Sequence, residues 1–233
     1  MPYKLYLCAH GHELTAMATR NRPSEVEDSI VPWNVLEEWS ATLFLVAGGL
    51  MVVHTGVHTL IAFTNTNYPL HHELPFGVAG HILAFVALLG LYPQLVARTP
   101  KLARGSAGLA VLGTVGWSVI GAQTLSETLG VGLPAWLGIF AILTIVTVIL
   151  GYLAFGVAGL RTGIVTRTTA VVLVTPVLVM VYNMTVALTT GGTEEGQIIV
   201  AGGFALAHLA IGAALRSEEF PTDLTETASS TAT

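Results

Sequence analysis

The stretch TLGVGLPAWLGIFAILTIVTVILGYLAFGVAGL, from Thr128 to Leu160, contains no charged residue. About 20 apolar residues in an α-helix are enough to cross the roughly 30 Å hydrocarbon core of a bilayer. Inside lipid the backbone has to satisfy its own hydrogen bonds, so an apolar run of this length becomes a helix. This stretch therefore predicts a membrane-spanning α-helix.

Similar uncharged runs account for most of the rest of the chain. They are Trp39–Tyr68, Leu74–Ala97, Gly105–Ser126, Thr168–Thr193 and Gly196–Leu215. The 233 residues are 53% hydrophobic and only 10% charged, whereas soluble domains average about 25% charged residues. We therefore predict an all-α, polytopic integral membrane bundle of about six transmembrane helices, embedded in the lipid bilayer of the cell membrane.

The basic residues predict the orientation of this bundle. Lys and Arg near the ends of spans favour the cytoplasmic side. Here they occur only before the first span, after the last, and in alternate loops: Lys4, Arg20, Arg22, Arg98, Lys101, Arg104, Arg161, Arg167 and Arg216. Both termini are thus predicted to be cytoplasmic. The predicted parts are a polar tail (1–33), a six-helix transmembrane domain (34–216) and an acidic, disordered tail (217–233).

Several function classes are excluded by composition. The net charge of -5 and the lack of a dense basic patch argue against nucleic acid as a partner. No predicted span contains a lysine, which excludes a retinal Schiff base. Cys8 is the only cysteine, so an internal disulfide is impossible. Other membrane-protein subunits or further copies of the chain are the partners that we expect.

The histidines are unevenly distributed. The segment HTGVHTLIAFTNTNYPLHHELPFGVAGH, from His54 to His81, holds five of the eight in the chain. Apart from tyrosines, the only titratable side chains within the predicted spans are His54, His58, His81 and His208. Ionisable groups within a membrane are costly and usually mark functional sites. These four histidines are therefore the candidate site residues.

The predicted hairpin between the first two spans brings three of these histidines together. At a helical rise of 1.5 Å per residue, His58 and His81 would both lie roughly 8–9 Å below the predicted external surface. His54 precedes His58 by four residues, so it shares the same helix face one turn deeper. His208 would lie roughly 18 Å deep in the last span. We therefore expect His54, His58 and His81 to converge, with His208 within reach.

Converging imidazoles allow several functions. Neutral imidazole is the commonest protein metal ligand, so His54, His58 and His81 could hold a copper or zinc ion. Alternatively, haem b could take its axial ligands from these three or from His208. Either centre predicts an electron-transfer or redox subunit of a membrane complex. The alternatives are a non-enzymatic accessory or scaffold subunit, in which histidines tie helices together, and a small proton-linked transporter.

One further polar residue lies within a predicted span. Asn183 follows Pro176 in the fifth span, where a proline frees a backbone carbonyl and an asparagine needs a partner. The pair is compatible with a helix irregularity that lines a cavity. The sequence favours the simpler interpretation, an ordinary interhelical hydrogen bond.

Overall fold

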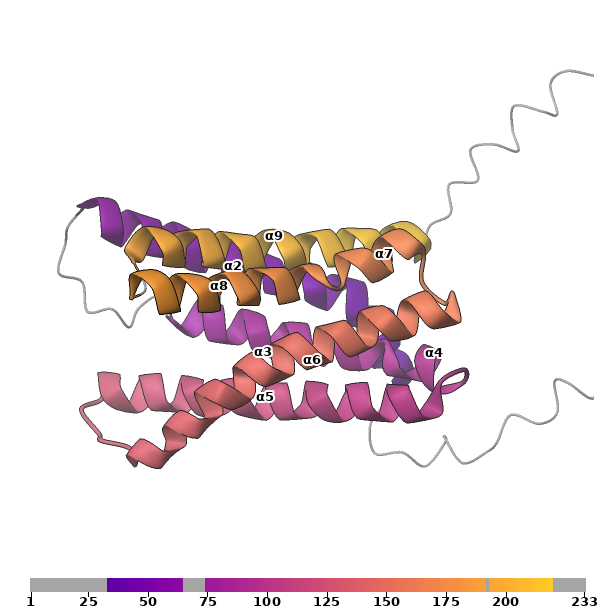
Figure 1. The fold of residues 1–233 in the computed structure, drawn as a ribbon, viewed down its shortest axis with the longest axis horizontal. Coiled ribbons are helices and arrows are strands. Elements are labelled where there is room, and N and C mark those ends of the chain that lie inside the picture. The colour runs from indigo at the N-terminus through magenta and orange to yellow at the C-terminus, as the bar shows by residue number, and fades with distance from the viewer. Residues whose placement is uncertain (1–32, 65–73, 192, 220–233) are drawn as a thin grey trace, which may run out of the picture. The chain divides into compact units, whose positions relative to one another are not determined.

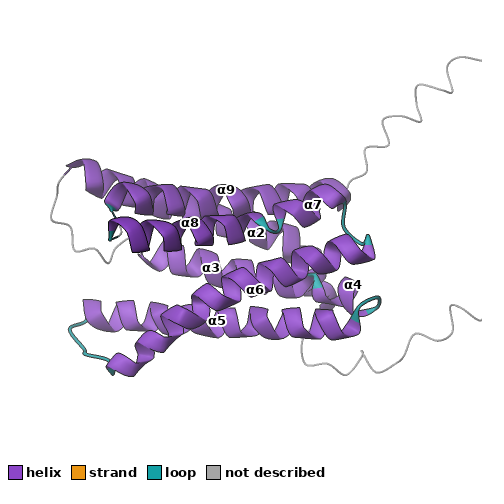
Figure 2. Cartoon of the chain, viewed as in Figure 1, coloured by secondary structure: helices purple, strands orange, loops and turns teal. Residues whose placement is uncertain are grey.

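The computed structural model describes residues 33–64, 74–191 and 193–219, and Figure 1 shows their arrangement. Within these ranges the ordered elements are all helices, with no strand, as Figure 2 shows. The helices are α2 (Trp33–Thr64), α3 (Leu74–Gly90), α4 (Tyr92–Val96), α5 (Pro100–Thr128), η2 (Ala135–Gly138), α6 (Ile139–Thr162), α7 (Arg167–Val172), α8 (Thr175–Thr190) and α9 (Glu194–Glu219).

Among the described residues, six helical stretches are long and apolar enough to cross a membrane, which confirms the all-α architecture and agrees with the predicted number of spans. The second stretch combines α3 with α4, and the fifth combines α7 with α8. Most of the predicted tails, residues 1–32 and 220–233, lies outside the described residues. Helix α9 continues to Glu219, so the last helix extends slightly beyond the predicted boundary at residue 216.

Two of the spans are interrupted at a proline. Pro93 lies in the first turn of α4, and Pro176 lies in the first turn of α8. Proline suits this position because the first helical N–H groups have no partner within the helix. The fifth span is interrupted between α7 and α8, about two helical turns before Asn183. Asn183 therefore belongs to α8, which begins as a separate helix.

The spans form a ring in which each one packs against its neighbours. Helix α2 packs against α3 and α9, α5 packs between α3 and α6, and α8 contacts α6 and α9. The α3–α4 and α9 spans are more deeply buried than the other four. Side chains of α3 and α9 therefore form much of the interior, and polar groups on them face other helices.

Glycines allow α2 and α9 to approach closely in the middle of the bundle. A Cβ atom on Gly48 would lie 2.8 Å from the backbone nitrogen of Leu209, and one on Gly212 would lie 2.9 Å from the backbone oxygen of Ala41. Small residues permit such backbone contacts between helices in lipid. The centre of the α2–α9 interface is therefore closed by direct helix contact.

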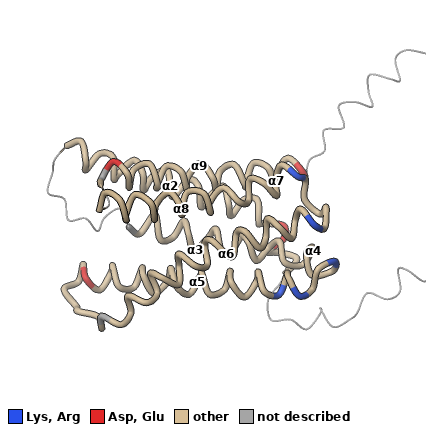
Figure 3. The backbone as a smooth tube through the Cα atoms, viewed as in Figure 1, with Lys and Arg blue, Asp and Glu red and all other residues tan. Residues whose placement is uncertain are grey.

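The charged residues lie near the two ends of the bundle, and Lys and Arg lie at one end only within the described residues, as Figure 3 shows. One end, called the basic end here, carries every described Lys and Arg: Arg98, Lys101, Arg104, Arg161, Arg167 and Arg216. Glu127 and Glu195 lie at the opposite end, called the Glu127 end. The helix directions thus place the basic loops together, as the sequence pattern requires.

This charge separation predicts the topology. A reporter fused after Leu133 should be external, and reporters fused after Lys101 or Thr166 should be cytoplasmic, because Lys and Arg near span ends favour the cytoplasm. Alkaline phosphatase and fluorescent-protein fusions provide complementary readouts. An external signal from the Lys101 fusion would contradict the predicted orientation.

Candidate functional site

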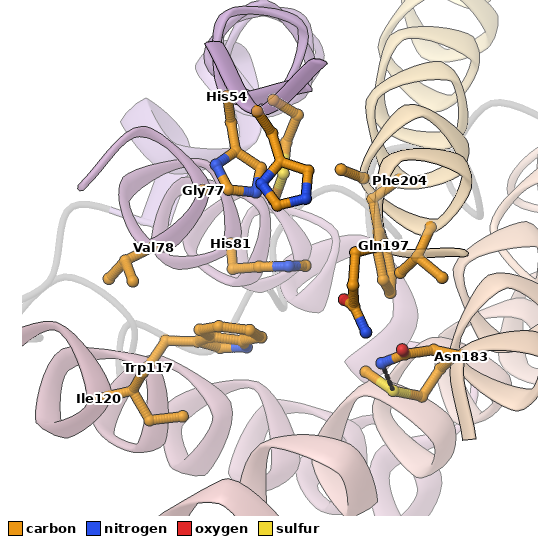
Figure 4. A pocket seen from close by; sticks show the side chains of 14 residues that line it. His54, Gly77, Val78, His81, Trp117, Ile120, Asn183, Gln197 and Phe204 are labelled. Carbon is orange, nitrogen blue, oxygen red and sulfur yellow. Dashed lines mark hydrogen bonds between the residues drawn. The ribbon is translucent and has the colours of Figure 1, made fainter. Parts of the chain in front are cut away.

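Three of the four span histidines line one cavity of about 220 Å³ between α2, α3, α5, α8 and α9. We call it the histidine cavity, and Figure 4 shows it from close by. Its polar lining residues are His54, His58, His81, Trp117, Asn183 and Gln197. The described residues that line it include no Asp, Glu, Lys or Arg. The cavity lies toward the Glu127 end of these helices.

Helix α2 supplies two of the imidazoles. His54 and His58 stand on successive turns, with ring centroids 6.2 Å apart and an interplanar angle of 28°. The His54 ring packs against α3 at Gly77, where a Cβ atom would lie 3.3 Å from the ring atoms. The four-residue spacing thus places both rings on one face of α2, and Gly77 accommodates one of them.

Helix α3 supplies the third imidazole and holds it between aromatic rings. His81 is buried and stacks on Trp117 of α5, with ring centroids 3.9 Å apart and an interplanar angle of 14°. The Phe204 ring on α9 meets the His81 ring nearly edge to face, at 4.8 Å and 81°. Such aromatic contacts fix the plane of the His81 ring. The hairpin formed by α2 and α3 therefore brings His81 to the same cavity as His54 and His58.

His208 does not line the cavity, but its ring lies next to that of His81, with centroids 5.9 Å apart and an interplanar angle of 84°. It is fully buried on α9, and its Nε2 atom lies 2.9 Å from the Tyr152 hydroxyl of α6. Its Nδ1 is buried and has no hydrogen-bond partner among the described residues. With the proton on Nδ1, Nε2 accepts the Tyr152 O–H. The Tyr152 hydroxyl thus occupies Nε2, and the ring links α9 to α6.

The sequence did not indicate Trp117, Gln197 or Tyr152 as site residues. Trp117 could have been noticed, because tryptophan in membrane proteins is enriched at the interfaces, whereas Trp117 lies in the interior of α5.

Asn183 does line the cavity, and its amide donates to the sulfur of Met180 at 3.9 Å. Sulfur is a weak acceptor, so this contact leaves most of the amide's hydrogen-bonding capacity for the cavity.

The described residues add no support for the predicted metal or haem centre. No three His, Cys, Asp or Glu side chains of the described chain form a group that could hold a metal ion. His71, His72 and Glu73 lie outside the described residues. A cavity of about 220 Å³ is also smaller than the roughly 300–1,000 Å³ typical for drug-sized ligands, and a porphyrin is at least that large. The metal or haem centre stays a prediction.

A second cavity of about 220 Å³ lies toward the basic end of the same helices. We call it the basic-end cavity. It is lined by Glu37, Gln94 and Glu218 together with mainly apolar residues. Gln94 donates to Glu37 at 3.0 Å, and a Glu218 carboxylate oxygen accepts the Thr166 backbone N–H at 2.9 Å. Both carboxylates therefore have partners at the cavity wall.

Fully buried side chains occupy the helices between the two cavities. These are Phe44 of α2, Phe85 and Leu88 of α3, Tyr152 of α6, and His208 and Ile211 of α9. The phenyl ring of Phe44 stacks against the His208 ring, with centroids 6.2 Å apart. The middle of the bundle is thus closed, and each cavity is confined to one half of the spans.

Comparison of the chain with protein-family models, with curated proteins and with solved structures found no match. The function is therefore inferred from the chemistry of the cavities.

Proposed function

We propose that this multi-pass membrane protein is a proton-linked transporter of a small uncharged solute, with the histidine cavity as its binding site. The observation that carries the proposal is the presence of three imidazoles in one cavity, between helices long and apolar enough to span a membrane, whose described lining contains no charged side chain. Ionisable groups in this setting are costly and commonly form proton pathways in transporters.

The histidines supply the proton-exchanging groups. Imidazole is the side chain that most readily gains or loses a proton near neutral pH. Among the described lining residues of the histidine cavity, only His54, His58 and His81 have this property. A solute that hydrogen-bonds to one of these rings changes the balance between its protonated and neutral forms, which couples solute binding to proton uptake or release.

The two cavities and the closed region between them support transport. Transporters expose their binding site to one side of the membrane at a time. Here cavities lie in opposite halves of the same helices, and the Phe44–His208 layer separates them. If the Phe44–His208 layer opened while the outer mouth of the histidine cavity closed, a solute could pass from the histidine cavity to the basic-end cavity.

The scaffold alternative accounts for fewer observations. His208 behaves as that alternative expects, because its ring links α9 to α6 through the Tyr152 hydroxyl. It does not account for a cavity lined by three further imidazoles and two amides. If the transport experiment fails, we infer a scaffold role.

The proposal is tested with purified protein in lipid vesicles that contain a pH-sensitive dye. Glycerol, urea, acetamide and benzamide are added outside in turn, and the internal pH is recorded. At least one of these uncharged solutes should change the internal pH, and His81→Gln should reduce the rate at least tenfold. The glutamine amide keeps hydrogen-bonding capacity but cannot take up the proton.

The matched control is Thr185→Gln, which introduces the same side chain at an exposed position of α8. Its rate should equal that of the wild-type protein. If folded wild-type protein gives no pH change with any of the four solutes, the proton-linked function is wrong. Solute uptake without a pH change would likewise contradict the proton coupling.

A further inference from the structure

The size of the histidine cavity limits what it can bind. Its volume is about 220 Å³. An apolar protein cavity of roughly 150 Å³ holds one benzene molecule, whereas drug-sized ligands need at least about 300 Å³. One substituted six-membered ring therefore fits the cavity, and two fused rings with substituents do not.

The lining excludes a charged occupant. Histidine is the only ionisable residue type among the described lining residues, and no Arg, Lys or carboxylate faces the cavity as a counter-ion. A charge within the membrane region is costly unless it is paired. With the imidazoles neutral, the occupant is therefore uncharged while it is bound.

One buried donor in the cavity has no acceptor. The Nε1–H of Trp117 is buried and has no hydrogen-bond partner in the described structure. The indole group can only donate, and a buried donor without an acceptor costs about 1–3 kcal/mol. Such a group calls for an acceptor oxygen on the molecule that fills the cavity.

The other polar groups add both donors and acceptors at the same place. Asn183 and Gln197 each carry an amide with two N–H donors and one acceptor oxygen. Figure 4 shows these amides, the indole of Trp117 and the nitrogens of His81 around a common space. Side-chain amides pair best with a partner that presents a donor beside an acceptor, as they do with adenine.

The rest of the lining is flat or apolar. The Trp117–His81 stack and the Phe204 ring form an aromatic wall, and Val78 and Ile120 complete the apolar part. A sugar or polyol would leave many hydroxyl groups without partners against such walls. A flat ring with a single polar edge would leave no polar group without a hydrogen-bond partner.

We infer that the histidine cavity binds an uncharged, single-ring molecule whose carboxamide-type edge, a C=O beside an N–H, faces Trp117, Asn183 and Gln197. This inference rests on the proposed function for the use of the site and adds the chemical class of the solute. The Trp117 indole donates to the carbonyl oxygen of the bound molecule. The side-chain amides of Asn183 and Gln197 hydrogen-bond to the remaining donor and acceptor of its polar edge.

The test uses benzamide, benzoate and isopropylbenzene, which share one shape and differ in charge and polarity. Binding to the full-length protein in lipid nanodiscs is measured by titration calorimetry. Benzamide should bind at least tenfold more tightly than benzoate or isopropylbenzene. Trp117→Phe keeps an aromatic ring but removes the N–H donor, and it should weaken benzamide binding at least fivefold. Trp136→Phe, at an exposed tryptophan, should leave the affinity unchanged.

Equal binding of benzamide and benzoate, or unchanged benzamide binding in a folded Trp117→Phe variant, would overturn the inference. The two proposals fail separately. Proton movement with glycerol alone, without benzamide binding, would refute the inference and keep the transport function. Tight benzamide binding without any proton movement would keep the inference and refute the transport function.

Discussion

Gly48→Ala should lower the melting temperature of the purified protein, whereas Gly49→Ala should leave it unchanged or raise it slightly. A Cβ on Gly48 would lie 2.6 Å from Leu209 Cγ and 2.8 Å from the Leu209 backbone nitrogen. The leucine side chain can rotate away, but the backbone nitrogen moves only if α9 shifts. The clash therefore separates the two helices.

The expected magnitude follows from two opposing terms. Overpacking a tight interface costs about 1–3 kcal/mol and sometimes more, while replacing glycine by alanine inside a helix gains up to about 1 kcal/mol. A net loss of about 2 kcal/mol corresponds to about 4–8 °C for a protein of this size. The measurement is a thermal melt in detergent.

Gly49 is the matched control because it follows Gly48 directly, and a Cβ atom added to it would meet no neighbouring atom within 4 Å. Only the helix-propensity gain should act there. If Gly48→Ala melts at the same temperature as Gly49→Ala, the close approach of α2 and α9 is wrong.

Tyr152→Phe should destabilise the protein by about 1–3 kcal/mol, because it leaves Nε2 of the fully buried His208 without a partner. The phenyl ring preserves the packing, so the lost hydroxyl accounts for the change. Tyr182→Phe, at an exposed tyrosine of α8, should alter the melting temperature little.

A double-mutant cycle with His208→Leu separates the hydrogen bond from the packing loss. When both partners are apolar, no buried nitrogen remains unsatisfied, so the double variant should lose less stability than the two single variants combined. Strictly additive losses would show that Tyr152 and His208 do not interact.

The six spans were predictable because the decisive signal is local. A long uncharged run such as Thr128–Leu160 becomes a helix in lipid whatever its neighbours are. The convergence of His54, His58 and His81 was also predictable, since the three residues lie on one hairpin and the turn returns the chain to the same depth. Both predictions need only the order of residues along neighbouring helices.

The rest of the site depends on contacts between helices that are distant in sequence. Trp117, Asn183 and Gln197 reach the cavity only because α5, α8 and α9 surround the α2–α3 hairpin. The Tyr152–His208 hydrogen bond joins residues 56 positions apart. The order of residues shows the polarity of these side chains but not the rotation of each helix about its axis, which decides what every side chain faces.

The length of α2 has a consequence for the membrane around the site. The helix has 32 residues, and those from Trp39 to Thr64 are uncharged. This uncharged part extends about 39 Å at 1.5 Å per residue, beyond a hydrocarbon core of roughly 30 Å. A helix with such a hydrophobic mismatch tilts, or thickens the surrounding bilayer. In bilayers of longer lipids α2 stands more upright, and His54 and His58 lie farther from the headgroups. Lipid chain length thereby sets how much hydrocarbon a polar molecule must pass on its way to these rings.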